Sequence, residues 1–220
     1  MIQPDTVIYS KRKTLSISID AFGRLTVRAP RQYSQARIEV FLQEKEDWIL
    51  RKKAERTGAG IQLPPENLDG YKLLLLGKKC EIRLIPGKNV GYNKEENCLY
   101  LPEKNARERL VKWLKENAKR IFEQVTAEQA KKMGLAYKSV TVTSARGRWG
   151  SCSAENALRY SFRLLYAPKE VIEYVVVHEL SHVKHKNHAR EFWQEVERYV
   201  PDWKAKRKWL KTYGGLMQVL

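Results

Sequence analysis

The residues best suited to chemistry lie in one short stretch of the chain. All four histidines of the 220-residue sequence fall between residues 178 and 188. His178, Glu179 and His182 form the pattern H-E-x-x-H, in which the two histidines lie about one helical turn apart and share a face. Two histidines with this spacing can bind one zinc ion, and the glutamate beside them can reach a zinc-bound water as a general base. The stretch therefore predicts a zinc site on a helix, with Glu179 as its catalytic residue.

A third protein ligand is expected from the two remaining histidines. An α-helix rises about 1.5 Å per residue, so His185 would lie roughly 10 Å along an unbroken helix from His178. Zinc–nitrogen bonds are about 2 Å long, so two rings that far apart cannot share an ion with His182. His188 comes within reach if the helix ends near Asn187 and the chain turns back, and Asn is suited to helix ends. We therefore expect the metal to be bound by His178, His182 and His188, with His185 as the alternative third ligand.

Composition indicates a globular protein with a basic surface. The chain has 42 Lys and Arg residues against 25 Asp and Glu, a formal net charge of +17, and 43% of its residues are hydrophobic. No apolar run approaches the roughly 20 residues that span a bilayer, and the N-terminus has no signal-peptide pattern, so we expect no membrane association. Three widely spaced cysteines suit a reducing compartment, which predicts a cytoplasmic protein. The basic excess favours anionic partners, including nucleotides and nucleic acid bound at the surface.

The hydrophobic pattern predicts an α+β protein in two parts. The first part, residues 1–101, is expected to be a β-rich accessory region with one helix, which begins after Ser34 and ends at Gly58 and Gly60. Period-two alternation and turn residues predict its strands at residues 6–10, 14–19, 25–28, 71–76, 79–85 and 97–101.

The second part, residues 102–220, is expected to be the hydrolase domain. A long helix is predicted from about residue 103 to Gly134, and the metal-binding helix is expected to begin at Pro168. Strands are predicted on either side of a loop at residues 144–153. The two strands are expected at residues 138–143 and 158–162. Two further helices are expected after His188, at about 189–200 and about 202–213.

The chain resembles the YgjP-like metallopeptidase family of the zincin group. The resemblance rests on residues 146–152 (Arg-Gly-Arg-Trp-Gly-Ser-Cys), Ala167-Pro168, residues 174–182 with the H-E-x-x-H motif, and Asn187-His188 followed by Phe192-Trp193. It implies a zincin-like catalytic domain, a zinc ion bound by His178, His182 and His188, and a catalytic Glu179. It leaves the substrate open, because the family is associated both with peptidases and with hydrolysis of UTP to UMP and pyrophosphate.

Three functions therefore remain open: a zinc-dependent peptidase, a nucleotide diphosphatase, and a basic nucleic-acid-associated module with a structural zinc. The motif favours a peptidase, whereas the net charge and the arginine-rich loop favour a nucleotide, because guanidinium groups bind phosphate in a bidentate manner. The intact glutamate argues against a purely structural zinc. Arg146, Arg148 and His185 are the candidates for contacting substrate and stabilising an oxyanion. A nucleophilic Cys152 is disfavoured, because its small neighbours suit a tight turn better than an activated thiol.

Overall fold

The structure is a computed structural model, and it describes residues 2–20, 22–57 and 63–220. These residues form six α-helices, two short 3-10 helices and ten strands in three sheets, which confirms the predicted α+β class. The chain divides into two compact units, residues 1–62 with 212–216 and residues 63–211 with 217–220. The predicted boundary between residues 101 and 102 falls inside the second unit, and a functional division at that point stays a prediction.

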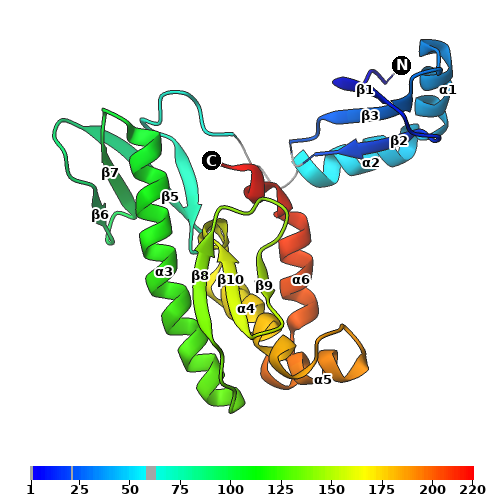
Figure 1. Ribbon diagram of the computed structural model, residues 1–220. Coiled ribbons are helices and arrows are strands. Elements are labelled where there is room, and N and C mark those ends of the chain that lie inside the picture. The colour runs from blue at the N-terminus through cyan, green and yellow to red at the C-terminus, as the bar shows by residue number, and fades with distance from the viewer. Residues whose placement is uncertain (1, 21, 58–62) are drawn as a thin grey trace. The chain divides into compact units, whose positions relative to one another are not determined.

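The first unit is a small sheet with two helices (Figure 1). The strand order is β1-β3-β2, and β3 is parallel to β1 but antiparallel to β2. The elements are β1 (Thr6–Ser10), β2 (Ser16–Ile19), β3 (Leu25–Pro30), α1 (Gln35–Glu44) and α2 (Glu46–Thr57). Alternate residues of β3 and the inner faces of the helices form the core, which consists of Leu25, Val27, Ala29, Ile38, Leu42 and Ile49. A separate core of this kind is what allows the unit to be compact by itself.

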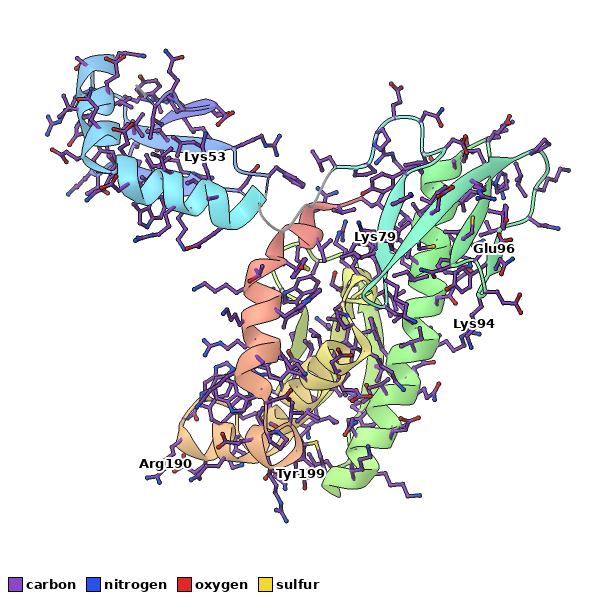
Figure 2. The ribbon with its side chains drawn as sticks, turned by 180° about the vertical axis from the view of Figure 1, so that it is seen from behind. Lys53, Lys79, Lys94, Glu96, Arg190 and Tyr199 are labelled. Atoms are coloured by element: carbon purple, nitrogen blue, oxygen red, sulfur yellow. The ribbon has the colours of Figure 1, made fainter. Side chains whose placement is uncertain are left out.

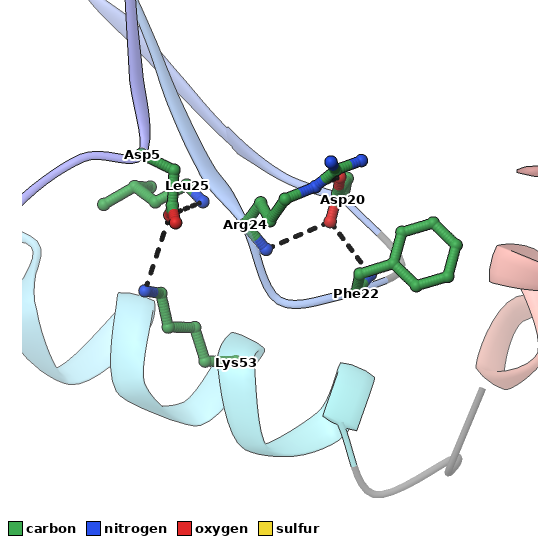
Figure 3. A network of polar contacts seen from close by, with 6 residues as sticks. All are labelled: Asp5, Asp20, Phe22, Arg24, Leu25 and Lys53. Carbon is green, nitrogen blue, oxygen red and sulfur yellow. Dashed lines mark hydrogen bonds and ion pairs between the residues drawn. The ribbon is translucent and has the colours of Figure 1, made fainter. Parts of the chain in front are cut away.

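Two aspartates hold segments of this unit together through polar contacts (Figure 3). Asp20 accepts hydrogen bonds from the backbone N–H groups of Phe22 and Arg24 at 2.8 and 3.0 Å, which closes the turn between β2 and β3. Asp5 accepts the N–H of Leu25 at 2.7 Å and lies 3.9 Å from the ammonium group of Lys53 on α2. The second aspartate therefore ties the start of the chain to both β3 and α2.

The second unit holds two sheets and the helices that carry the histidines (Figure 1). One sheet has the order β4-β5-β7-β6, and the other has the order β8-β10-β9. In each sheet one pair of strands is parallel, namely β5 with β7 and β10 with β8. The strands are β4 (Lys72–Leu75), β5 (Lys78–Ile85), β6 (Gly91–Asn93), β7 (Cys98–Pro102), β8 (Ser139–Thr143), β9 (Gly150–Cys152) and β10 (Ala157–Ser161). The helices are α3 (Ala106–Met133), η1 (Phe162–Tyr166), α4 (Lys169–Lys184), α5 (Arg190–Tyr199) and α6 (Trp203–Thr212), whose last residue belongs to the first unit; η2 (Gly214–Gln218) has residues in both units.

The turn between β4 and β5 fixes the start of α4. The N–H groups of Leu76 and Gly77 donate to the carbonyls of Leu165 and Tyr166 at 2.7 and 3.2 Å. Gly77 has a φ of +79°, and a Cβ atom there would lie only 2.8 Å from Cγ of Pro168. Glycine is therefore required both by the backbone conformation and by the close approach. Because Pro168 immediately precedes α4, the turn between β4 and β5 holds the start of the helix that carries the H-E-x-x-H motif.

Three features differ from the sequence prediction. The single helix predicted after Ser34 is two helices, because the chain leaves helical geometry at Lys45, which has φ −107° and ψ 11°. Its predicted end at Gly58 and Gly60 lies outside the described residues. The strands β6 and β9 are absent from the prediction, since each has three residues and is defined by pairing with a longer neighbour.

None of the helices in the described ranges combines the length and the apolar character needed to cross a membrane.

Candidate metal centre

The H-E-x-x-H motif lies on the last two turns of α4. The preceding residues of this helix are apolar and buried, with Val176, Val177 and Leu180 fully enclosed where α4 contacts α3, α5 and β9. Burial on this scale anchors the helix on several sides. His178 and His182 are half-buried, whereas Glu179 is buried with only 6% of its surface exposed. The motif thus sits where packing restricts its side chains.

The chain reverses after α4 and returns a third histidine to the motif. The helix ends at Lys184, earlier than the predicted end near Asn187, and His185 is extended with φ −121° and ψ 101°. The Nε2 atom of His188 then lies 3.1 Å from the Nε2 atom of His178. One ligand atom each from His178, His182 and His188 fall within 4.8 Å of one another. The structure thus brings these three histidines together and leaves His185 outside the group.

The three histidines fit a zinc ion. Zinc–nitrogen bonds of about 2.0–2.1 Å at tetrahedral angles place ligand nitrogens about 3.3 Å apart, close to the 3.1 Å between His178 and His188. Nδ1 of His182 lies 2.9 Å from the carbonyl oxygen of His185, so Nδ1 carries the proton and Nε2 is free to bind metal. Burial, together with His182 and His188, lowers the pKa of His178 to about 3. The His178 ring is therefore neutral at physiological pH, as a metal ligand must be.

Helix α5 packs aromatic rings against the histidines. This helix runs between Arg190 and Tyr199, both labelled in Figure 2. The ring of Phe192 is fully buried, and its centroid lies 4.8, 4.5 and 4.7 Å from those of His178, His182 and His188. On the outer side, Trp193 stacks on His188 at 5.7 Å and on Trp203 of α6 at 4.3 Å. These contacts restrict the rotamers of the three ligands before any metal binds.

Glu179 is held in place by the backbone of β9. A Cβ atom on Gly150 would lie 2.6 Å from Oε1 and 2.8 Å from Cγ of Glu179, so the glutamate packs directly on this glycine. Burial raises the pKa of the Glu179 carboxyl to about 8, and the Arg148 guanidinium opposes this only in part. A buried carboxyl with a pKa close to neutral is suited to both accepting and donating a proton.

A cavity of about 350 Å³ opens beside His178 and Glu179. Its polar lining includes two groups that the sequence interpretation missed, the hydroxyl of Tyr174 and the guanidinium of Arg207. Tyr174 lies one helical turn before His178, which is a signal that helical spacing offers. Arg207 lies on α6, in the short basic run at residues 204–208, and nothing in the local sequence points to the site. Both groups can donate hydrogen bonds to a substrate oxygen in this cavity.

The remaining candidates take different places. Arg148 and Arg146 are both exposed; Arg148 lines a second, smaller cavity together with Gly150, whereas Arg146 lines neither of these two cavities. The backbone carbonyl of His185 accepts a hydrogen bond from Nδ1 of His182. Burial raises the pKa of the Cys152 thiol, which disfavours the thiolate that a nucleophile requires. The other two cysteines, Cys80 and Cys98, are buried free thiols.

Comparison with known proteins gives one match over most of the chain. A family model described as "YgjP-like, metallopeptidase domain" matches residues 13–213. Among solved structures, the crystal structure of the metallopeptidase zymogen of Methanocaldococcus jannaschii jannalysin is similar with a TM-score of 0.34 and 20% identity. That similarity covers 39% of this chain and 91% of the other, and at this TM-score it has no bearing on activity. No curated protein matches the chain.

Proposed function

Because the chain belongs to the YgjP-like metallopeptidase family, we propose that it is a zinc-dependent hydrolase that cleaves polypeptides. The observation that carries this proposal is the convergence of His178, His182 and His188 beside a cavity lined by Glu179. Three protein ligands leave a fourth position for water and substrate, as in catalytic zinc sites, whereas structural sites fill it with protein. Within the described residues no fourth His, Cys or carboxylate joins the group, which favours an enzyme over a structural zinc module.

Glu179 has the central role in proton transfer. When bound, a zinc ion supplies Lewis acidity: it polarises a substrate oxygen and lowers the pKa of a bound water to about 7. The Glu179 carboxylate accepts the proton of the attacking water and then donates it to the leaving group. Close packing on Gly150 restricts the positions that the carboxyl can take. Packing of α4 against β9 leaves only 6% of the Glu179 surface exposed.

Tyr174 and Arg207 are placed to stabilise negative charge on the substrate. Both line the cavity beside Glu179. Burial raises the pKa of Tyr174 to about 12, so its hydroxyl keeps its proton and remains a donor at neutral pH. The Arg207 guanidinium packs over the Trp193 ring at 5.3 Å, which restricts its position. These two residues complement Arg146, Arg148 and His185, the candidates from the sequence.

One experiment tests the function and separates the two substrate classes. Zinc-loaded wild-type protein and the Glu179→Gln variant are assayed side by side with an unfolded protein and with UTP. We expect the wild type to cleave the polypeptide, and the variant to keep its zinc but lose turnover. Retained turnover in the variant would exclude Glu179 as the general base. Cleavage of UTP without cleavage of polypeptide would instead establish the second candidate, a nucleotide diphosphatase, which the unpaired arginines beside the site favour.

The cellular setting follows from surface charge and cysteine chemistry. We propose a cytoplasmic location, because Cys80, Cys98 and Cys152 are free thiols. A net charge of +17 would also support weak, salt-sensitive association with nucleic acid. Fractionation and binding at two salt concentrations would test these two points.

A further inference from the structure

A second, polar cavity lies beside the reaction cavity. It has a volume of about 170 Å³, which corresponds to roughly six water molecules at about 30 Å³ each, enough for a phosphate or carboxylate group. Its polar lining residues are Thr143, Arg148, Ser151, Arg159 and Ser161. Gly150 lines both this cavity and the one that contains Glu179. The two spaces therefore meet at a single residue of β9.

Strand register places the polar lining on one face of the sheet. Arg159 of β10 pairs with Ser151 of β9, so their side chains project from the same face. The next residue, Tyr160, points to the opposite face, where it is fully buried and packs on Phe122 of α3 at 5.5 Å. The polar residues thus occupy the face of the sheet opposite the one on which Tyr160 packs against α3.

The two arginines of this cavity form no ion pair in the described chain, although Arg148 interacts electrostatically with Glu179. Among the residues that the structure describes, neither Arg148 nor Arg159 forms a hydrogen bond or an ion pair, and no acidic side chain belongs to the cavity lining. The hydroxyl of Ser151 is likewise unpartnered there. By contrast, the hydroxyl of Ser161 already donates to the carbonyl of Ala145 at 2.7 Å. Two guanidinium groups and one hydroxyl therefore remain as donors around one space.

From this geometry we propose that the cavity is an anion-binding subsite, in which Arg148, Arg159 and Ser151 hold a phosphate or carboxylate group of the substrate. Guanidinium groups bind both kinds of anion through paired N–H donors. Gly150 pairs with Tyr160, so Glu179 packs on the face of β9 opposite the one that carries Ser151 and Arg159, and an anionic group held here would lie across this edge strand from the glutamate. The subsite would thus select substrates with an acidic group that extends past β9 from the reacting bond. Its role in selection rests on the proposed hydrolase function, whereas binding of the anion does not.

Anion binding is measured on metal-free protein, so that neither zinc nor turnover contributes. Inorganic phosphate is titrated by calorimetry, and acetate is titrated in a second arm. Tighter binding of phosphate assigns the subsite to phosphate groups, and equal or tighter binding of acetate assigns it to carboxylates. Arg148→Gln and Arg159→Gln should each weaken binding about tenfold or more, as expected for the loss of one charge-assisted contact. Arg159→Lys should recover part of the affinity, since it keeps the charge but loses the planar fork.

The matched control is Arg120→Gln, which removes one exposed arginine of α3 that hydrogen-bonds only to Asn117 in the described structure. It should leave anion affinity unchanged. An equal loss of anion affinity in this control would show that the effect comes from general surface charge, and would overturn the proposal. The absence of saturable anion binding would overturn it as well. If anions bind as expected but no substrate is hydrolysed, the proposed function fails while the subsite stands. If substrate is hydrolysed but no anion binds, the subsite fails while the proposed function stands.

Discussion

Replacing Gly150 by alanine is a direct test of how Glu179 is positioned. The added Cβ atom would lie 2.6 Å from Oε1 and 2.8 Å from Cγ of the glutamate, whereas ordinary contact begins at 3.4 Å. The carboxyl must therefore move by about 0.8 Å, the difference between 3.4 and 2.6 Å. Glu179 is buried with 6% exposed, so its surroundings restrict where it can go. A displacement of about 1 Å at a catalytic group costs on the order of 100-fold in rate, and we expect a loss of kcat of that size.

The assay compares Gly150→Ala with Gly147→Ala, at a glycine in the loop that precedes β9. A Cβ atom on Gly147 meets no atom within 4 Å, and neither glycine has a positive φ, so the control adds the same methyl group without a clash. Both variants should bind zinc as the wild type does, because the histidines remain in place. The control should keep its activity.

A double variant shows whether the loss acts through Glu179. If Gly150→Ala works by displacing the carboxyl, then adding it to Glu179→Gln should reduce kcat little further, because residues that act as a unit are not additive. A methyl group that merely obstructs the cavity would raise KM and would lower the activity of the double variant again. Activity of Gly150→Ala within about threefold of the wild type would refute the positioning argument, given the 100-fold loss expected from a displaced base.

Three further predictions concern the metal, the fold and pH. His188→Ala should weaken zinc binding on the order of 100-fold or more, whereas His185→Ala should change it little, because His185 contacts His182 only through its backbone carbonyl. A competition titration with a chelator measures both affinities, and the reverse order would show that His185 rather than His188 is the third ligand. Gly77→Ala should lower the free energy of unfolding by about 1–3 kcal/mol in urea titrations, since it combines a positive φ with a clash against Pro168, and an unchanged midpoint would contradict the role of that turn. In metal-free protein the folded-state pKa of Glu179, about 8, exceeds the ordinary 4.5, so stability should be full below pH 4.5 and fall as the pH rises towards 8. Glu179→Gln should remove this fall, and equal slopes in wild type and variant between pH 5 and 8 would contradict it.

The sequence predicted those parts of the centre that depend on local geometry. Helical spacing places His178 and His182 on one face, and the axial rise separates His185 from them. The reversal that returns His188 was expected as well, and the structure has it, with the helix ending a little earlier. The family resemblance read from the residues is confirmed by the match over residues 13–213. The roles of the individual residues stay predictions that the variants above test.

Parts of the site that depend on distant pairing were not predictable from the local sequence. Arg207 lines the cavity from α6, which follows the motif by two helices, and Arg159 looks like an ordinary surface residue of a strand until its neighbours are known. The helix break at Lys45 has no glycine or proline to mark it. For the two arginines the deciding contacts join residues far apart in the sequence, and periodicity carries no information about them.

Strand β9 shows how a segment that reads as a loop can determine chemistry. Its three residues follow a run rich in glycine and arginine, which by local rules favours a turn. Pairing with β10 makes it a strand and brings Gly150 onto Glu179. Any side chain at this position would occupy the space of the carboxyl, so the glycine is required by the glutamate rather than by the backbone. The same short strand lies between the cavity beside Glu179 and the arginine-lined cavity, so under the proposed function its position would set both the place of proton transfer and the approach of the substrate.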